Sequence, residues 1–80
     1  MTVFETVKKF IVEVKDIPGD DIQLESRFEE DLEADSLDVV EMIMLLEEEY
    51  DFEIPEEVAE TLKTVKDVVD YIEKCLAESA

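Results

Sequence analysis

Residues 36–50 read SLDVVEMIMLLEEEY, and this stretch is the strongest indication of the architecture. At about 100° per residue it places one apolar stripe on a single helical face, formed by Val39, Met42, Ile43, Leu46 and Tyr50. Further apolar residues point largely elsewhere: Leu37, Val40, Met44 and Leu45. A helix that is apolar all round is normally buried all round, but an 80-residue domain cannot enclose its central helix completely. We therefore expect a helix from Ser36 to Tyr50 with one face in the core and another open to partners.

Three more helices are expected around this one. The first runs from Thr2 to Val14, and a short helix follows Pro55, which suits a first helical position. The last begins at Thr64, whose side chain can cap the helix while Asp67 completes a capping box. Its apolar stripe is Val65, Val68, Val69, Ile72 and Leu76. The expected fold class is all-α: a small antiparallel-type four-helix bundle with three main helices and a short third one, in a single domain over residues 1–80.

A long loop, Asp16 to Asp35, should connect the first two main helices. Ser26 and Glu29 have capping-box spacing, which predicts one helical turn near the sequence SRFEE. The expected anchors of this loop on the core are Leu24, Phe28 and Leu32. So long a loop is unusual in a small domain and indicates a functional connection.

The charge of the chain is distributed unevenly. The formal net charge is −18, and the segment from Phe28 to Leu62 holds 15 of the 25 acidic residues without one Lys or Arg. Such a segment repels nucleic acid and anionic lipid and attracts basic protein surfaces, although it could also be only a solvated face.

No apolar run is long enough to span a membrane and no secretory signal is evident, so we expect a cytoplasmic protein, or an organellar one after removal of a transit peptide. Cys75, the only cysteine, is expected to pack as a small apolar residue.

Ser36 stands at the start of the central helix. Asp35 is the better N-cap, and Asp38 completes a capping box, so Ser36 should be the first helical residue with a free hydroxyl. The chain has no histidine, and the nearest lysines in sequence are 21 and 27 positions away, so a serine nucleophile and any other catalytic residue are not expected. A phosphate attached to this serine would lie at the positive end of the helix dipole. The pattern predicts a substrate of another enzyme and leaves the attached group open.

A specific calcium site is not expected, although acids surround Ser36. In an EF-hand register that begins at Asp31, position six is Ser36 instead of glycine and position twelve is Met42 instead of glutamate. We therefore predict no metal site, only loose binding of divalent ions.

One further face of the central helix is both apolar and acidic. Leu37, Glu41, Met44 and Glu48 share it. Methionine adapts to different partners, and carboxylates steer basic ones, so this face suits transient docking. The alternative is that Val40 and Met44 pack against the short third helix.

The sequence DLEADSLDVVEMIMLLEEEYDFEIPEE (residues 31–57) resembles the acyl carrier proteins of dissociated, type II fatty acid synthesis. The matching positions are Asp35, Ser36, Leu37 and Asp38 in the core motif, Glu41, Met44, Glu47 and Glu48 in the following helix, and Ile54 and Pro55 after it. The stretches VKKF, SRFEEDL and TVKDVVDYIE match the first helix, the loop and the last helix, so the resemblance covers nearly the whole chain.

This resemblance implies a carrier and not an enzyme. A phosphopantetheinyl transferase would attach 4′-phosphopantetheine from coenzyme A to Ser36 through a phosphodiester, and the thiol of this arm would hold growing acyl chains as thioesters, which the bundle can shelter. Implied partners are fatty acid synthesis enzymes such as ketoacyl synthases, reductases, dehydratases and acyltransferases. We expect a monomer that binds no nucleic acid and does not insert into a membrane. The implied docking residues are Asp35, Leu37, Asp38, Glu41, Met44, Glu47 and Glu48.

Two positions depart from the family pattern. Glu33 stands where the family usually has glycine, and a positive φ there would cost about 1 kcal/mol or more. Leu45 stands where a smaller residue is commoner, and it could enlarge the docking patch or intrude on the acyl cavity. The alternative functions are a carrier of a polyketide, peptidyl or D-alanyl pathway and, from another class, an unmodified acidic binding protein that mimics DNA or buffers cations.

Overall fold

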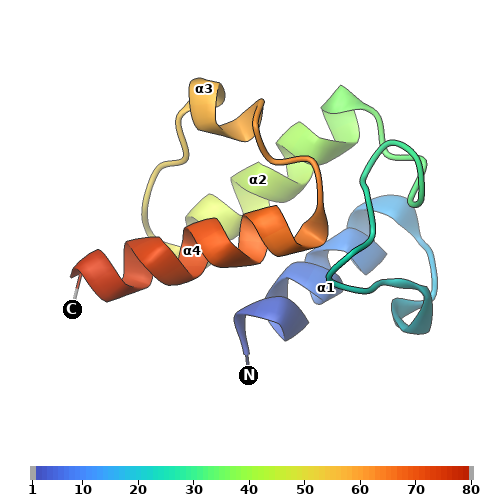
Figure 1. Ribbon diagram of the computed structural model, residues 1–80, viewed down its shortest axis with the longest axis horizontal. Coiled ribbons are helices and arrows are strands. Elements are labelled where there is room, and N and C mark those ends of the chain that lie inside the picture. The colour runs from blue at the N-terminus through green and yellow to red at the C-terminus, as the bar shows by residue number, and fades with distance from the viewer. Residues whose placement is uncertain (1, 80) are drawn as a thin grey trace.

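The computed structural model of the protein describes residues 2–79, which form helices joined by loops (Figure 1). The elements in chain order are α1 (Val3–Lys15), a 3-10 helix η1 (Gly19–Asp21), α2 (Ser36–Tyr50), α3 (Glu56–Ala59) and α4 (Val65–Ser79). The predicted all-α fold with three main helices and a short third one is confirmed. None of the described helices is both long and apolar enough to cross a membrane.

Local capping signals explain where the helices begin. Thr2 caps α1 by accepting a hydrogen bond from the Glu5 amide, so α1 begins one residue later than predicted. The predicted capping box of α4 is present: the Thr64 amide donates to Asp67 Oδ2 at 3.2 Å, and the Asp67 amide donates to Thr64 Oγ1 at 3.1 Å. Pro55 is the N-cap of α3, immediately before its first helical residue.

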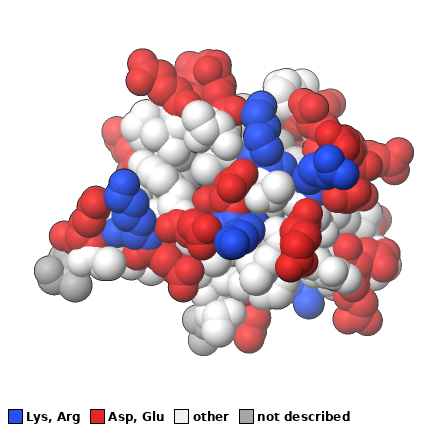
Figure 2. Space-filling model, in the orientation of Figure 1, with Lys and Arg blue, Asp and Glu red and all other residues white. Residues whose placement is uncertain are grey.

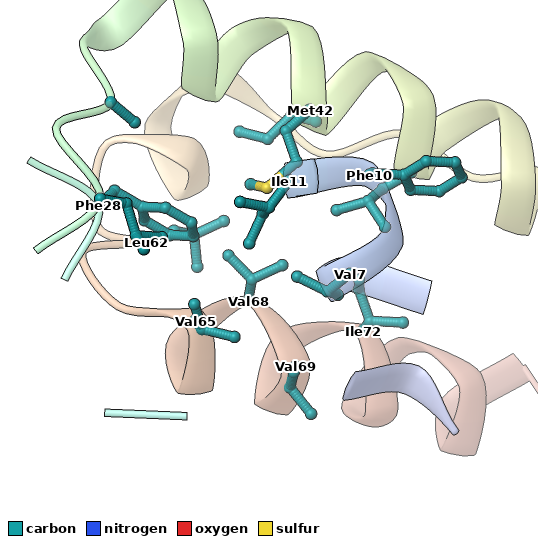
Figure 3. Packing of buried hydrophobic residues seen from close by; sticks show 14 of the residues in the cluster. Val7, Phe10, Ile11, Phe28, Met42, Leu62, Val65, Val68, Val69 and Ile72 are labelled. Carbon is teal, nitrogen blue, oxygen red and sulfur yellow. The ribbon is translucent and has the colours of Figure 1, made fainter. Parts of the chain in front are cut away.

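The core lies where α1 packs against both α2 and α4 (Figure 3). Its most deeply buried side chains are Val7, Leu46, Val65, Val68 and Ile72. Leu46 belongs to the apolar stripe predicted on the central helix, and Val65, Val68 and Ile72 belong to the stripe predicted on the last helix. The stripe of α4 ends earlier than predicted, because Leu76, one turn beyond Ile72, is 39% exposed.

The long loop is fastened to the start of α4 by backbone hydrogen bonds. The Phe28 amide donates to the Lys63 carbonyl at 3.0 Å, and the Val65 amide donates to the Ser26 carbonyl at 3.0 Å. Two of the predicted anchors, Phe28 and Leu32, are buried, and Leu24 is half-buried against the core. The loop is therefore a packed part of the domain, and it delivers the chain to the start of α2.

The predicted capping box of this loop is wrong. The Ser26 hydroxyl accepts from the Gln23 amide at 2.9 Å, and among the described residues no hydrogen bond joins it to the Glu29 amide. A single turn does form after it, in which the Asp31 amide donates to the Arg27 carbonyl at 2.9 Å. Asp31, and not Ser26, stabilises that turn by accepting from the Arg27 amide. The short 3-10 helix η1, which follows Pro18, was not predicted from the sequence.

Candidate functional site

The start of α2 is held by the capping box predicted from Asp35 and Asp38. The Asp38 amide donates to Asp35 Oδ1 at 2.9 Å, and the Asp35 amide donates to Asp38 Oδ2 at 3.3 Å. Ser36 is the first residue of the helix and is exposed. Neither capping bond uses the serine hydroxyl, so it is presented to solvent at the positive end of the helix dipole.

The turn that leads into this capping box contains a residue with left-handed backbone. Glu33 has φ of 53°. This is the position where the sequence departs from the usual glycine, and its positive φ confirms that the turn has the conformation glycine would favour. A side chain with a Cβ pays roughly 1 kcal/mol or more for this conformation.

Lys15, the last residue of α1, reaches both sides of the serine. Its Nζ donates to the Glu33 carbonyl oxygen at 3.0 Å and to Asp38 Oδ2 at 3.0 Å. The hydrogen bond from Lys15 lowers the pKa of Asp38, and partial burial opposes this shift without cancelling it. Sequence reasoning counted Lys15 as 21 positions from Ser36 and treated it as remote. No local pattern indicates the contact, because it depends on how α1 packs against α2.

A groove of about 380 Å³ opens beside Ser36, between α2, α3 and the long loop. Its apolar walls are Phe28, Val39, Val40, Ile43, Ala59 and Leu62. Its polar rim is Arg27, Glu29, Glu30, Asp35, Ser36, Glu56, Glu60 and Lys63. An alkyl chain that entered this groove would gain about 0.8 kcal/mol for each methylene group it buried. A chain tethered at the serine would therefore have an apolar place to rest.

The predicted docking face of α2 is open to solvent. Leu37 is 72% exposed and Met44 is 56% exposed, and the carboxylates of Glu41 and Glu48 beside them are also exposed. Met44 is not among the residues that line the groove toward α3 or that pack against the core. Val40 is 48% exposed and lines the groove toward α3, which agrees in part with the alternative that it faces the short helix.

The implied docking residues are not equally free. The Glu47 carboxylate accepts a hydrogen bond from the Ile54 amide at 2.7 Å, so it holds the connection between α2 and α3. Asp38 is engaged by Lys15, as described above. Leu45 is half-buried against the core and does not line the groove. The docking roles of Asp38 and Glu47 remain predictions.

Acidic side chains dominate the visible surface, and the basic side chains stand among them as small separate groups (Figure 2). Within residues 2–79, no three potential metal-ligating side chains are grouped so that they could hold an ion. Cys75 is half-buried and lies near Tyr71, whose pKa is raised by burial and by a hydrogen bond with Cys75. Neither Tyr71 nor Cys75 lines the groove beside Ser36.

Comparison with known proteins agrees with this geometry. The family described as "Phosphopantetheine attachment site" matches residues 5–72. An "Acyl carrier protein" of Helicobacter hepaticus is 58% identical over 73 residues, which are 91% of this chain and 96% of that protein. The cofactor of such proteins is a covalent phosphopantetheine, and they carry groups instead of catalysing reactions. The chain therefore belongs to the phosphopantetheine-attachment family, and within it to the acyl carrier proteins.

Proposed function

We propose that Ser36 bears the phosphopantetheine group and that this carrier serves fatty acid synthesis. One observation carries the assignment: Ser36 is an exposed first residue of a well-capped helix and also lines the mouth of an apolar groove. The other serine whose side chain is described, Ser26, is buried, and its hydroxyl is engaged by Gln23.

The residues around Ser36 favour a phosphodiester at its hydroxyl. The free amides of the first turn and the helix dipole stabilise negative charge there. Lys15 offsets the charge of Asp38, one of the two acids beside the serine. In the modification, Ser36 Oγ would displace adenosine 3′,5′-bisphosphate from coenzyme A and lose its proton. When attached, the arm supplies a terminal thiol that holds an acyl group as a thioester.

The groove would shelter this acyl group between visits to enzymes. Its volume of about 380 Å³ lies within the range of ordinary small-molecule sites, about 300–1,000 Å³. Ser36 is at its rim, so a flexible arm could fold back over Val40 and deliver the chain to the apolar walls.

The exposed face of α2 would be the docking surface for partners. Leu37 and Met44 supply apolar contact, and Glu41 and Glu48 supply charge that steers basic surfaces. We propose the same face for the phosphopantetheinyl transferase and for ketoacyl synthases, reductases, dehydratases and acyltransferases. We place the protein, as a monomer, in the cytoplasm, with these enzymes.

Intact-mass measurement tests the attachment. Wild type, Ser36→Ala and the matched control Ser26→Ala are each incubated with coenzyme A, Mg²⁺ and a broad-specificity transferase. Wild type and the control should gain the mass of one phosphopantetheine, and Ser36→Ala should gain none. Modification of Ser36→Ala would refute the assignment, and an unmodified wild type would favour the acidic binding protein.

A second measurement tests the pathway. The modified protein is charged with an acyl group and offered to a ketoacyl synthase of type II fatty acid synthesis. Steady turnover supports the proposal. Failure with this enzyme, together with loading by a D-alanine ligase or a peptide synthetase domain, would assign the carrier to another pathway.

A further inference from the structure

A single ammonium group joins the end of α1 to both flanks of Ser36. Lys15 Nζ lies 3.0 Å from the Glu33 carbonyl oxygen, three residues before the serine, and 3.0 Å from Asp38 Oδ2, two residues after it. The same Asp38 oxygen accepts the Asp35 amide at 3.3 Å, so the lysine is also connected to the capping box.

This contact differs from the other ion pairs of the described residues. Those two pairs lie within residues 27–31 and join neighbours on one turn. The Lys15–Asp38 pair spans 23 positions and brings a cation to a segment that has none of its own. Its side chains are 23% and 26% exposed, so the pair is held against the protein more closely than a surface pair.

The residue before the capping box explains why such a clamp would matter. Glu33 has a positive φ, which a residue with a Cβ adopts only at a cost. Without a contact to its carbonyl oxygen, this turn could relax toward ordinary backbone angles. Water can replace a lost hydrogen bond at a partly exposed oxygen, but it cannot fix the distance between α1 and residues 33–38. The lysine therefore contributes geometry more than bond energy.

We propose that Lys15 is a positioning residue for the modification of Ser36: it holds residues 33–38 in the conformation that the transferase binds. The inference rests on the proposed attachment at Ser36. A transferase must bring the serine oxygen close to a phosphorus atom of coenzyme A, and a misplacement of about 1 Å can cost about 100-fold in rate. A segment that is already ordered reaches this position without a search.

The two kinetic parameters should respond differently to loss of the clamp. If the transferase accepts only the ordered segment, the apparent affinity falls in proportion to the ordered fraction. Once bound, the segment is in the same conformation, so kcat stays near the wild-type value. We expect Lys15→Met to raise the KM of the transferase for this protein about five- to tenfold, which is the size expected for the loss of one ordinary intramolecular hydrogen bond.

The matched control is Lys9→Met. It removes the same charge from the same helix, but Lys9 is exposed and lies over the Phe10 ring, away from residues 33–38. Its KM should stay within about twofold of wild type, as expected for a substitution that changes only long-range charge. Lys15→Arg, which keeps the charge and can donate to two oxygens, should restore most of the wild-type KM.

A readout in the absence of enzyme tests the ordering directly. Hydrogen exchange of the Asp38 and Val39 amides, at a temperature where circular dichroism shows a folded protein, should be faster in Lys15→Met than in Lys9→Met. If Lys15→Met does not fold, Lys15→Gln, which is too short to reach both oxygens, replaces it in the same comparison with Lys15→Arg.

The outcomes distinguish the proposed attachment at Ser36 from the proposed role of Lys15. A wild type that gains no mass would refute the proposed function itself. A wild type that is modified normally, with Lys15→Met showing the KM of Lys9→Met, would overturn the positioning role alone. A fall in kcat with unchanged KM would also overturn it, because the lysine would then act after binding.

Discussion

The capped start of α2 and the exposed face of the same helix are built in opposite ways. The start is held by a capping box and by Lys15 from another helix. The exposed face presents Leu37, in the first turn, and Met44, two turns later, to solvent, with no contact that covers them among the described residues. If Ser36 is the attachment site, as we propose, the capped start must present its hydroxyl in one geometry. The proposed docking face would meet several partners and would gain from exposure and adaptable side chains. One helix therefore combines a fixed site with an open surface.

Changes of solvent and of single residues should alter the stability of these regions to different extents. The largest effect on stability is expected for the acidic segment as a whole, from Phe28 to Leu62, which holds 15 acidic residues and no Lys or Arg. Salt screens charges over about 10 Å at 0.1 M. We expect the melting temperature to rise by several degrees when NaCl is added from low ionic strength, and Mg²⁺ to act at lower concentration. A melting temperature that stays constant or falls as salt is added would show that self-repulsion does not limit the stability of this fold.

The next effect concerns the fixed end of α2. Asp35→Ala removes the N-cap and should cost about 1 kcal/mol. For a domain of this size, this corresponds to a fall of about 4–8 °C in melting temperature. Leu37→Ala, two residues away and 72% exposed, is the control and should change stability by less than about 0.5 kcal/mol. Equal melting temperatures for the two variants would remove the distinction between the capped start of α2 and its exposed face.

A smaller effect should depend on pH. The pKa of Asp38 is lowered in the folded protein by the hydrogen bond from Lys15, so the pair stabilises the fold above the ordinary aspartate pKa, about 3.9. This contribution is lost as the pH falls through the lowered pKa. Lys15→Met should therefore melt below wild type at pH 7, and the difference should shrink at the acid end of the scale. A difference that is constant from pH 7 to pH 3 would mean that the lysine stabilises through packing and its hydrogen bond to the Glu33 carbonyl, and not through Asp38.

The sequence predicts local structure well where the signal lies within a few residues. The limits of α2 and the capping boxes at Asp35 and Thr64 follow from residues three positions apart, and the structure has them as predicted. The predicted Ser26–Glu29 box failed although its spacing was right, because the Ser26 hydroxyl accepts from the Gln23 amide, which is equally close in sequence on the other side. Short-range signals are therefore informative only when no other backbone group at the same spacing competes for the side chain.

Contacts between elements were beyond such reasoning. Lys15 meets Asp38 across 23 positions, and Glu47 meets the Ile54 amide through the fold of the following loop. The family resemblance placed both acids among the implied docking residues. Only the packing of α1 on α2, and the path of the chain into α3, show that these carboxylates also hold the structure.

The smallest expected effect on stability belongs to the docking face, where the effect on function should be clear. Glu41→Lys and Glu48→Lys alter exposed side chains, so each should change stability by less than about 0.5 kcal/mol. Charges at the rim of an interface act mainly on the association rate and its salt dependence. Each reversal should therefore slow modification by the transferase and turnover with a ketoacyl synthase at low salt, and the difference in rate from wild type should narrow as salt is added.

Met44→Ala should weaken partner binding with less effect on its salt dependence, because the substitution removes contact area and no charge. Glu73→Lys on α4 is the matched control, since it reverses an exposed acid outside the acidic segment. If both reversals on α2 fold normally and are processed at the rate of this control at low salt, the acidic stripe is only a solvated face, and steering has no part in how this carrier finds its partners.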